Sequence, residues 1–251
     1  MIEIQPVPSV NAELSIPGSK SLTQRALIAA ALARGESRLC GPLVSEDTEY
    51  SAQALARFGV RIDREDQECW IVEGNGGTVH ADETTIYLGN NGTATRFLTS
   101  VAALGNSAVT IDGDERMQQR PIGPLIAALR GWGVDIVSIR GTECPPLLVN
   151  ARGIAGGRTV LPEGRSSQYL SSLLLVAPYA RQPASLVVDG EVLSKPYVKM
   201  TLSVMADFGV LADCTPDLKS FAIPQGVYRG REYRIEGDAS NASYFWAAAA
   251  V

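Results

Sequence analysis

Three helix-like stretches of this chain end in the same glycine–valine pair, and this repetition constrains the fold more than any other sequence feature. The pairs are Gly59-Val60, Gly133-Val134 and Gly209-Val210, spaced 74 and 76 residues apart. Self-similarity at a fixed period is typical of repeat architectures. A glycine directly after the last helical residue commonly ends a helix. We therefore expect three copies of one structural unit.

A small or polar loop opens the first helix of each unit, and a fourth copy of this loop lies near the end of the sequence. The four openings are 21–25, 92–96, 166–170 and 240–244. The fourth helix has barely begun at Val251. We therefore expect the sequence to stop partway through a larger repeat protein.

Each unit is predicted to contain a helix, a strand, a second helix and two further strands. In the first unit the helices cover 23–34, ended by Gly35, and 46–58, and the strands cover 36–43, 60–63 and 69–72. In the second unit the helices cover 95–104 and 122–132, and the strands cover 108–112, 134–139 and 147–150. In the third unit the helices cover 168–176 and 197–208, and the strands cover 185–188, 210–213 and 220–223.

The first helix of each unit is apolar on nearly every side, as residues 26–33 illustrate. A helix without a polar face is buried. We expect an α/β protein with its first helices inside and its sheets outside, arranged around a pseudo-threefold axis. This order is the reverse of a doubly wound fold, in which helices cover both faces of a sheet. The alternative is an ordinary α/β sheet that happens to be rich in alanine.

Composition disfavours several classes of function. A net charge of −5 and a pI near 5.1 argue against a nucleic-acid partner, so local cations must hold any anionic ligand. With His80 as the single histidine we expect no metal site, and nothing indicates a cofactor. The four cysteines form no CxxC pair, the first residues do not read as a signal peptide, and no apolar run reaches membrane length. We expect a cytoplasmic protein without a membrane partner.

The loop 17–25 is the strongest candidate for a binding site. It places Lys20 and Ser21 at the start of a helix and Arg25 one turn further on. Free backbone N–H groups at a helix N-terminus favour an anion, and arginine suits phosphate or carboxylate. The alternative is a serine that caps the helix beside two surface cations.

The equivalent loops of the other units carry weaker signals. The glycine-rich loop 88–96 allows close approach to a ligand, although a tight turn explains it equally well. Ser166, Ser167 and Gln168 can cap a helix and can also bind a phosphate or a polyol. Arg120 precedes the second helix of its unit and is a further candidate anion ligand.

Together these loops resemble those of the EPSP synthases, the 3-phosphoshikimate 1-carboxyvinyltransferases of the enolpyruvyl transferase family. The resemblance runs from the N-terminus to Val251 in unbroken motif order. The motifs are Pro-Gly-Ser-Lys-Ser (17–21) with Arg25, Gly-Asn-Asn-Gly-Thr-Ala (89–94) with Arg96, Arg-Pro-Ile-Gly (120–123), Ser-Ser-Gln (166–168), Ser-Lys-Pro-Tyr (194–197) and Glu-Gly-Asp-Ala-Ser (236–240).

The resemblance implies transfer of an enolpyruvyl group from phosphoenolpyruvate to the 5-hydroxyl of shikimate 3-phosphate, in the pathway to chorismate and aromatic amino acids. It implies a catalytic role for Lys20, which touches both substrates. The residues implied for shikimate 3-phosphate are Lys20, Ser21, Arg25, Ser166, Ser167, Gln168, Ser194 and Tyr197. Those implied for phosphoenolpyruvate are Lys20, Asn90, Gly92, Arg120 and Gln168.

The family has two lobes of three repeats each, and this sequence matches chiefly one of them. The resemblance assigns 21–238 to the lobe that binds shikimate 3-phosphate, and 1–20 and 239–251 to the second lobe. That second lobe supplies the general base and further phosphoenolpyruvate ligands, so we expect it as a partner and expect little activity from this chain alone. Phe97 stands where many members have proline, which leaves sensitivity to the family's inhibitor glyphosate open.

Two other functions remain as alternatives. One is the sister enzyme, UDP-N-acetylglucosamine enolpyruvyl transferase, although Ser21 and the 166–168 loop argue against it. The other is a non-catalytic anion-binding domain, in which the loops serve only as helix caps.

Overall fold

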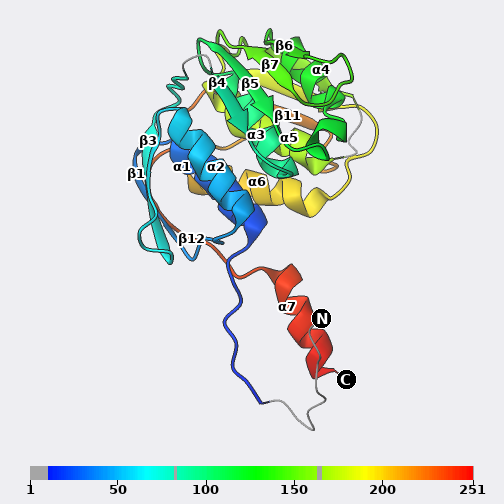
Figure 1. Cartoon of the computed structure of the whole chain (residues 1–251). Coiled ribbons are helices and arrows are strands. Elements are labelled where there is room, and N and C mark those ends of the chain that lie inside the picture. Colours follow the sequence, from blue (N-terminus) through cyan, green and yellow to red (C-terminus); the bar gives the residue numbers. More distant parts are fainter. Residues whose placement is uncertain (1–10, 82–83, 163–165, 251) are drawn as a thin grey trace.

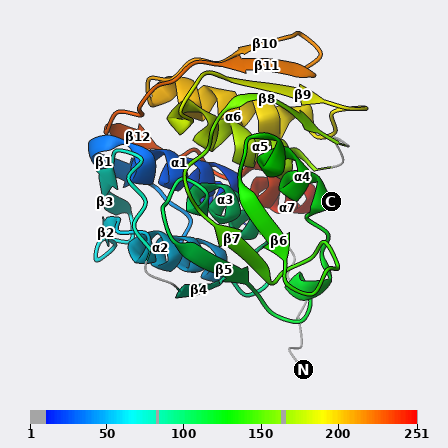
Figure 2. The same ribbon diagram turned by 90° about the horizontal axis from the view of Figure 1, so that it is seen from above.

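Three four-stranded sheets form the outside of the molecule in the computed structural model, which describes residues 11–81, 84–162 and 166–250. The first helix of each unit lies near the middle of the view in Figure 2, with the sheets around it. Residues 26–33 of the first of these helices are at most 2% exposed. The prediction of helices inside and sheets outside is confirmed.

The elements follow the repeat along the chain, as the colours of Figure 1 show. The first unit contains α1 (Lys20–Leu32), β1 (Arg34–Cys40), α2 (Glu46–Arg57), β2 (Arg61–Asp63) and β3 (Cys69–Asn75). The second contains β4 (Thr84–Tyr87), α3 (Gly92–Ala102), β5 (Ala108–Asp112), the 3₁₀ helix η1 (Met117–Gln119), α4 (Gly123–Gly131), β6 (Asp135–Ser138) and β7 (Leu147–Asn150). The third contains β8 (Gly157–Leu161), α5 (Ser167–Val176), the 3₁₀ helix η2 (Ala177–Tyr179), β9 (Ala184–Val188), α6 (Lys195–Asp207), β10 (Asp213–Cys214) and β11 (Ser220–Ile223). The chain continues with β12 (Glu232–Arg234) and α7 (Ala239–Ala249).

All three sheets share one topology, and this includes a strand that the sequence analysis missed. The orders are β12-β1-β3-β2, β4-β5-β7-β6 and β8-β9-β11-β10. The missed strands β4, β8 and β12 each pair in parallel with the strand that follows a first helix, namely β5, β9 and β1. Since β12 comes from the far end of the chain, the first sheet is completed by residues nearly two hundred positions away from β1.

The glycine–valine pairs close the second helix of each unit in the same way. Gly59, Gly133 and Gly209 have φ values of +84°, +80° and +90°, in the region that glycine adopts without steric cost. In each case the following valine donates its N–H to the carbonyl five residues earlier, at 2.9 to 3.1 Å. This is the hydrogen-bond pattern of a Schellman cap. The sequence repeat is therefore a structural repeat.

The first helix begins earlier and ends differently from its prediction. Ser19 is the N-cap of α1, and its hydroxyl accepts a hydrogen bond from the N–H of Leu22 at 3.4 Å. Ala33 is the C-cap with an extended backbone, and Gly35 already belongs to β1. The expectation that Gly35 ends this helix was wrong, because the chain passes directly from α1 into a strand.

Small polar side chains let the central helices pack closely. Ser172 Oγ on α5 lies 2.6 Å from Ser100 Oγ on α3 and 2.6 Å from the carbonyl oxygen of Arg96. Both serines are at most 1% exposed, so these hydrogen bonds satisfy hydroxyls that burial would otherwise leave without partners. The contact holds the middle and the last turn of α3 against α5, and both helices contribute to the site described below.

Residues 11–19 and the helix α7 project from the same side of the three-repeat body (Figure 1). A backbone bridge joins Gly18 to Gly237 at their base. Along α7 only Ala242 is buried, whereas Tyr244 and Trp246 are 76% and 66% exposed. None of the described helices has the length and apolarity needed to cross a bilayer.

Candidate active site

The first turns of α1, α3 and α5 meet at one pocket. A polar side chain caps each helix, and the caps are Ser19, Asn91 and Ser166. Because each helix directs its unpaired N–H groups and positive dipole end toward this region, the three repeats together favour an anion there. Capping and binding are therefore compatible functions of these loops.

The pocket has a volume of about 350 Å³ and gathers residues from all three units. Its lining consists of Lys20, Ser21, Arg25, Thr93, Ser166, Ser167, Gln168, Ser194 and Tyr197. Thus all eight residues that the resemblance implied for shikimate 3-phosphate lie around one cavity, which we call the main pocket. Thr93 was not predicted; its hydroxyl accepts a hydrogen bond from Gln168 Nε2 at 3.1 Å and so holds that amide at the wall.

Arg25 is not a surface cation, as the alternative interpretation of its loop assumed. Its side chain is only 2% exposed, and burial lowers the pKa of its guanidinium to about 10. The neighbouring Tyr197 opposes this effect. At neutral pH the group therefore remains positively charged inside the protein.

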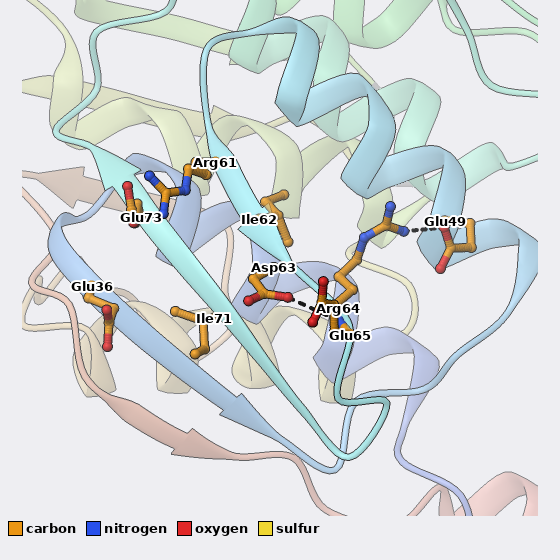
Figure 3. Close-up of a pocket in the computed structure, with 9 residues that line it drawn as sticks. All are labelled: Glu36, Glu49, Arg61, Ile62, Asp63, Arg64, Glu65, Ile71 and Glu73. Atoms are coloured by element: carbon orange, nitrogen blue, oxygen red, sulfur yellow. Dashed lines mark hydrogen bonds and ion pairs between the residues drawn. The ribbon is translucent and has the colours of Figure 1, made fainter.

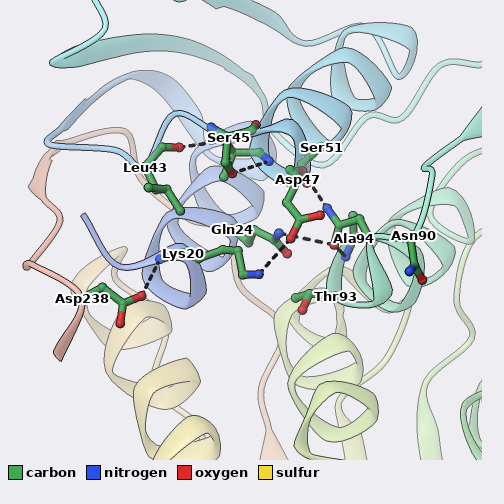
Figure 4. A network of polar contacts seen from close by, with 12 residues as sticks. Lys20, Gln24, Leu43, Ser45, Asp47, Ser51, Asn90, Thr93, Ala94 and Asp238 are labelled. Carbon is green, nitrogen blue, oxygen red and sulfur yellow. Dashed lines mark hydrogen bonds and ion pairs between the residues drawn. The ribbon is translucent and has the colours of Figure 1, made fainter. Parts of the chain in front are cut away.

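Lys20 lies at the mouth of the main pocket in contact with an acidic residue of α2. Its Nζ is 2.9 Å from Asp47 Oδ2, and its backbone N–H donates to Asp238 Oδ2 at 3.3 Å (Figure 4). The Asp47 carbonyl in turn accepts a hydrogen bond from Asn91 Nδ2 at 2.6 Å. The N-cap of α3 is thus linked to the residue that holds the lysine.

Ser194 stands before α6 in an unusual conformation. Its φ of +53° and ψ of +44° are left-handed, and its side chain makes no capping hydrogen bond with α6. Such strain in a residue other than glycine persists only where the surroundings enforce it, and it is common at ligand sites. The hydroxyl lines the main pocket, close to the partly exposed Tyr197.

A second hollow of about 700 Å³ shares Ser166 and Gln168 with the main pocket. Arg120 and the buried Arg96 line it on the side of the second unit. Burial is also the main cause that lowers the pKa of Arg96, and the positive charge of Arg120 adds to it. This region, which we call the arginine pocket, is a second place suited to an anion.

The remaining predicted residues lie beside the two arginines. Arg120 Nη1 is 3.4 Å from both the carbonyl and the side-chain oxygen of Asn90. A Cβ atom at Gly92 would lie 2.7 Å from Arg96 Nη1 and 2.9 Å from both terminal nitrogens of Arg120. Asn90 and Gly92 thus shape the wall around the guanidinium groups, although they do not line the arginine pocket itself.

Sequence reasoning missed Asp47, Thr93 and the role of Arg96. Asp47 lies within the acidic first turn of α2, where helix stabilisation alone explains a carboxylate. Thr93 and Arg96 stand inside the motif at 89–96. The role of Thr93 follows from its hydrogen bond to Gln168 and that of Arg96 from its burial, and no local pattern reveals either.

Another hollow of about 700 Å³ lies on the outer face of the first sheet and does not include residues of either site pocket (Figure 3). Its charged residues have mixed sign, for example Arg61 paired with Glu73 at 3.3 Å. Within 11–81, 84–162 and 166–250, no group of three or more His, Cys, Asp or Glu side chains is arranged to hold a metal ion.

The model of the EPSP synthase family, 3-phosphoshikimate 1-carboxyvinyltransferase, matches residues 4–251. The chain belongs to the EPSP synthase family. It is 45% identical over 244 residues to a 3-phosphoshikimate 1-carboxyvinyltransferase of Nostoc sp., an alignment that covers 96% of this chain and 57% of the relative. For the same enzyme from Photobacterium damsela the identity is 40% over 255 residues, with coverage of 100% and 59%.

Solved structures agree with this assignment at the level of the fold. The chain superposes on EPSP synthase from Acinetobacter baumannii with a TM-score of 0.82 and 24% sequence identity. That superposition covers 92% of this chain and 51% of the other. The chain thus spans less than two thirds of the length of these EPSP synthases.

Proposed function

We propose that this chain forms the shikimate 3-phosphate-binding half of an enzyme that transfers an enolpyruvyl group from phosphoenolpyruvate. The observation that carries the proposal is the main pocket, which unites eight implied residues from loops up to 177 positions apart. Two cations, several hydroxyls and an amide around one small cavity suit a phosphorylated polyol.

In this proposal the phosphate of shikimate 3-phosphate lies against Ser166 and Ser167 at the N-terminus of α5, and Arg25, one turn inside α1, binds an anionic group of the same molecule. Gln168, Ser194 and Tyr197 bind the hydroxyl and carboxylate groups of the ring. Phosphoenolpyruvate lies toward Arg120, with Asn90 and Gly92 shaping that side. Lys20, at the mouth of the main pocket, reaches both molecules.

The proposed reaction is an addition followed by an elimination. The 5-hydroxyl gives its proton to the general base expected from the second lobe as its oxygen forms a bond to C2 of phosphoenolpyruvate, and C3 gains a proton. Loss of a proton from C3 then expels inorganic phosphate and restores the double bond. Binding two anions side by side in the reactive orientation lowers the activation barrier, because the entropy of bringing them together is lost on binding and not in the chemical step. Fixed cations also stabilise the charge that shifts onto the departing phosphate.

The curated relatives extend well beyond the region matched here, so we infer that turnover requires further family sequence. We assign 21–238 to the substrate-binding lobe, and 1–20 and 239–251 to the second lobe. The exposed aromatic face of α7 suits packing against that lobe. We propose that the assembled enzyme works in the cytoplasm and needs no cofactor.

Calorimetry with shikimate 3-phosphate tests the proposal. We expect the purified chain to bind it, and Lys20→Met to weaken binding by roughly tenfold because a charge-assisted contact is lost. Lys219→Met is the matched control, since Lys219 is an exposed lysine outside both pockets and should not matter.

Two outcomes would contradict the proposal. If the folded chain binds UDP-N-acetylglucosamine and not shikimate 3-phosphate, the sister enzyme is the better assignment. If it binds neither and Lys20→Met leaves phosphate affinity unchanged, the loops serve only as helix caps.

A further inference from the structure

Arg25 is a buried cation without a carboxylate partner among the described residues. No Asp or Glu oxygen of 11–81, 84–162 or 166–250 forms an ion pair with it. A buried charge is normally paired or fully hydrogen-bonded. Other groups must therefore stabilise the charge of this guanidinium inside the protein.

Three oxygen atoms accept hydrogen bonds from the guanidinium. Nε donates to Thr201 Oγ1 at 2.8 Å, Nη1 to the Ser21 carbonyl at 2.9 Å, and Nη2 to Ser171 Oγ at 3.1 Å. Ser171 and Thr201 are both fully buried, and their hydroxyl oxygens lie 2.7 Å apart. Since a guanidinium has five N–H bonds, two remain available for a ligand in the main pocket.

The hydroxyl of Thr201 is oriented by its own surroundings. Its oxygen lies 2.9 Å from the carbonyl of Tyr197 one turn earlier and 2.7 Å from Ser171 Oγ, so its proton has an acceptor on the side away from Arg25. A lone pair is thereby left for Nε–H of the arginine. The hydroxyl of Thr201 therefore accepts a hydrogen bond from Arg25 in addition to the contact it makes with the carbonyl of its own helix.

An aromatic ring completes the surroundings. The Arg25 guanidinium lies over the ring of Phe97, 5.3 Å from the centroid, and Phe97 is only 2% exposed. Attraction between a cation and the face of an aromatic ring is strengthened by burial. Phe97 comes from α3 of the second unit, and Ser171 and Thr201 come from α5 and α6 of the third, so elements of both other units hold one arginine of α1.

We propose that Ser171, Thr201 and Phe97 are positioning residues that hold Arg25 with its two free N–H bonds toward an anionic group of shikimate 3-phosphate. We call these three residues the Arg25 socket. The proposal rests on the proposed function, because it assigns Arg25 to that substrate. Its physical basis is preorganisation: a guanidinium already fixed in place loses little rotamer freedom when the substrate binds.

Thr201→Val removes the hydroxyl while it keeps the shape of the side chain. We expect the affinity for shikimate 3-phosphate, measured by calorimetry on the full chain, to fall by about tenfold or more. Thr201→Ser retains the hydroxyl and should restore most of the affinity. Phe97→Leu should cause a smaller loss, since it removes the aromatic face and leaves the hydrogen bonds intact.

Thr99→Val is the matched control. Thr99 is a fully buried helical threonine whose hydroxyl bonds the carbonyl four residues earlier, at 2.6 Å, and it does not contact Arg25. Both valine variants should lower thermal stability, Thr201→Val by more because it also leaves the buried Nε–H of Arg25 without an acceptor. Only Thr201→Val should weaken binding. Equal affinities of the two valine variants would overturn the proposal, whereas absence of binding by the wild type would overturn the proposed function.

A measurement without ligand covers the case in which Thr201→Val does not fold. In nitrogen-15 NMR spectra of the wild type, the Nε–H of Arg25, assigned by its loss in Arg25→Lys, should exchange with water far more slowly than those of exposed arginines. Thr201→Ser should preserve this protection. An Arg25 Nε–H that exchanges as fast as the exposed ones would show that the socket does not hold the side chain.

Discussion

At the scale of single residues, the two guanidinium groups beside Gly92 leave no room for a side chain. The added methyl of Gly92→Ala would lie within 2.9 Å of three arginine nitrogens. Because Arg96 is buried, the more exposed Arg120 should be displaced. We predict that phosphoenolpyruvate affinity, measured by calorimetry with shikimate 3-phosphate present, falls by roughly tenfold. Gly226→Ala should have no effect, since its methyl would meet only Val210 at 3.3 Å; equal behaviour of the two variants would refute this account.

The ion pair between Lys20 and Asp47 makes a second prediction. Both side chains are partly exposed, so Asp47→Asn should change the free energy of unfolding by less than about 1 kcal/mol. Removing the negative charge should, however, make the mouth of the main pocket more positive. We expect inorganic phosphate to bind a few times more tightly in a calorimetric titration. Weaker binding would instead mean that the aspartate is needed to orient the lysine.

Cys40 and Cys69 give a prediction about pH. Their sulfur atoms are 2.8 Å apart on paired strands, and this contact with Cys69 is the main cause that raises the pKa of the Cys40 thiol to about 11. A raised pKa keeps the thiol protonated, and hence unreactive, over a range in which an ordinary cysteine has ionised. Alkylation of Cys40 by iodoacetamide, followed by mass spectrometry, should therefore increase up to pH 11. In Cys69→Ala the increase should occur at lower pH, and an unchanged profile would contradict the assigned cause.

At the scale of elements, the three Schellman caps allow the same change to be made in each repeat. Alanine with positive φ costs about 1–2 kcal/mol. A Cβ at Gly59 or Gly209 would meet nothing closer than 3.8 Å, whereas at Gly133 it would lie 3.2 Å from Ala155 Cβ. In urea denaturation we therefore expect similar losses of unfolding free energy for Gly59→Ala and Gly209→Ala, and a larger loss for Gly133→Ala. A different ranking would show that steric space at the glycine does not control the cost.

The elements found from the sequence were those with a local signal. Residues 26–32 of α1 are apolar on every side, and the end of α2 is marked by Gly59. The strands β4, β8 and β12 have three to five residues each, and each is recognisable only by its pairing with a parallel strand. One α-helix separates β4 and β8 from their partners, and most of the chain separates β12 from β1. Nothing within Glu232–Arg234 indicates that it pairs with β1, because the pairing depends on the arrangement of the whole repeat.

At the scale of the whole molecule, the same distinction applies to the site. Lys20, Ser21 and Arg25 could be identified because they share a loop with a recognisable chemistry. The residues that hold them come from other elements: Asp47 lies on α2 of the same unit and Thr201 on α6 of the third unit. Their roles follow from how the three repeats pack, and a single sequence contains no local mark of such contacts.

The surface of α7 makes the last prediction. Tyr244, Phe245 and Trp246 are 76%, 45% and 66% exposed on a helix of 11 residues. Apolar side chains gathered in this way usually mark an interaction site, and so short a helix gains most of its stability from packing. We expect the purified chain to self-associate as its concentration rises, as measured by light scattering. The double change Tyr244→Ser and Trp246→Ser should reduce this association without altering the fold, because both side chains are mostly exposed. Leu211→Ser is the control, since Leu211 is 73% exposed but lies outside α7. A chain that stays monomeric at every concentration, or that responds equally to both changes, would show that α7 is not the associating surface.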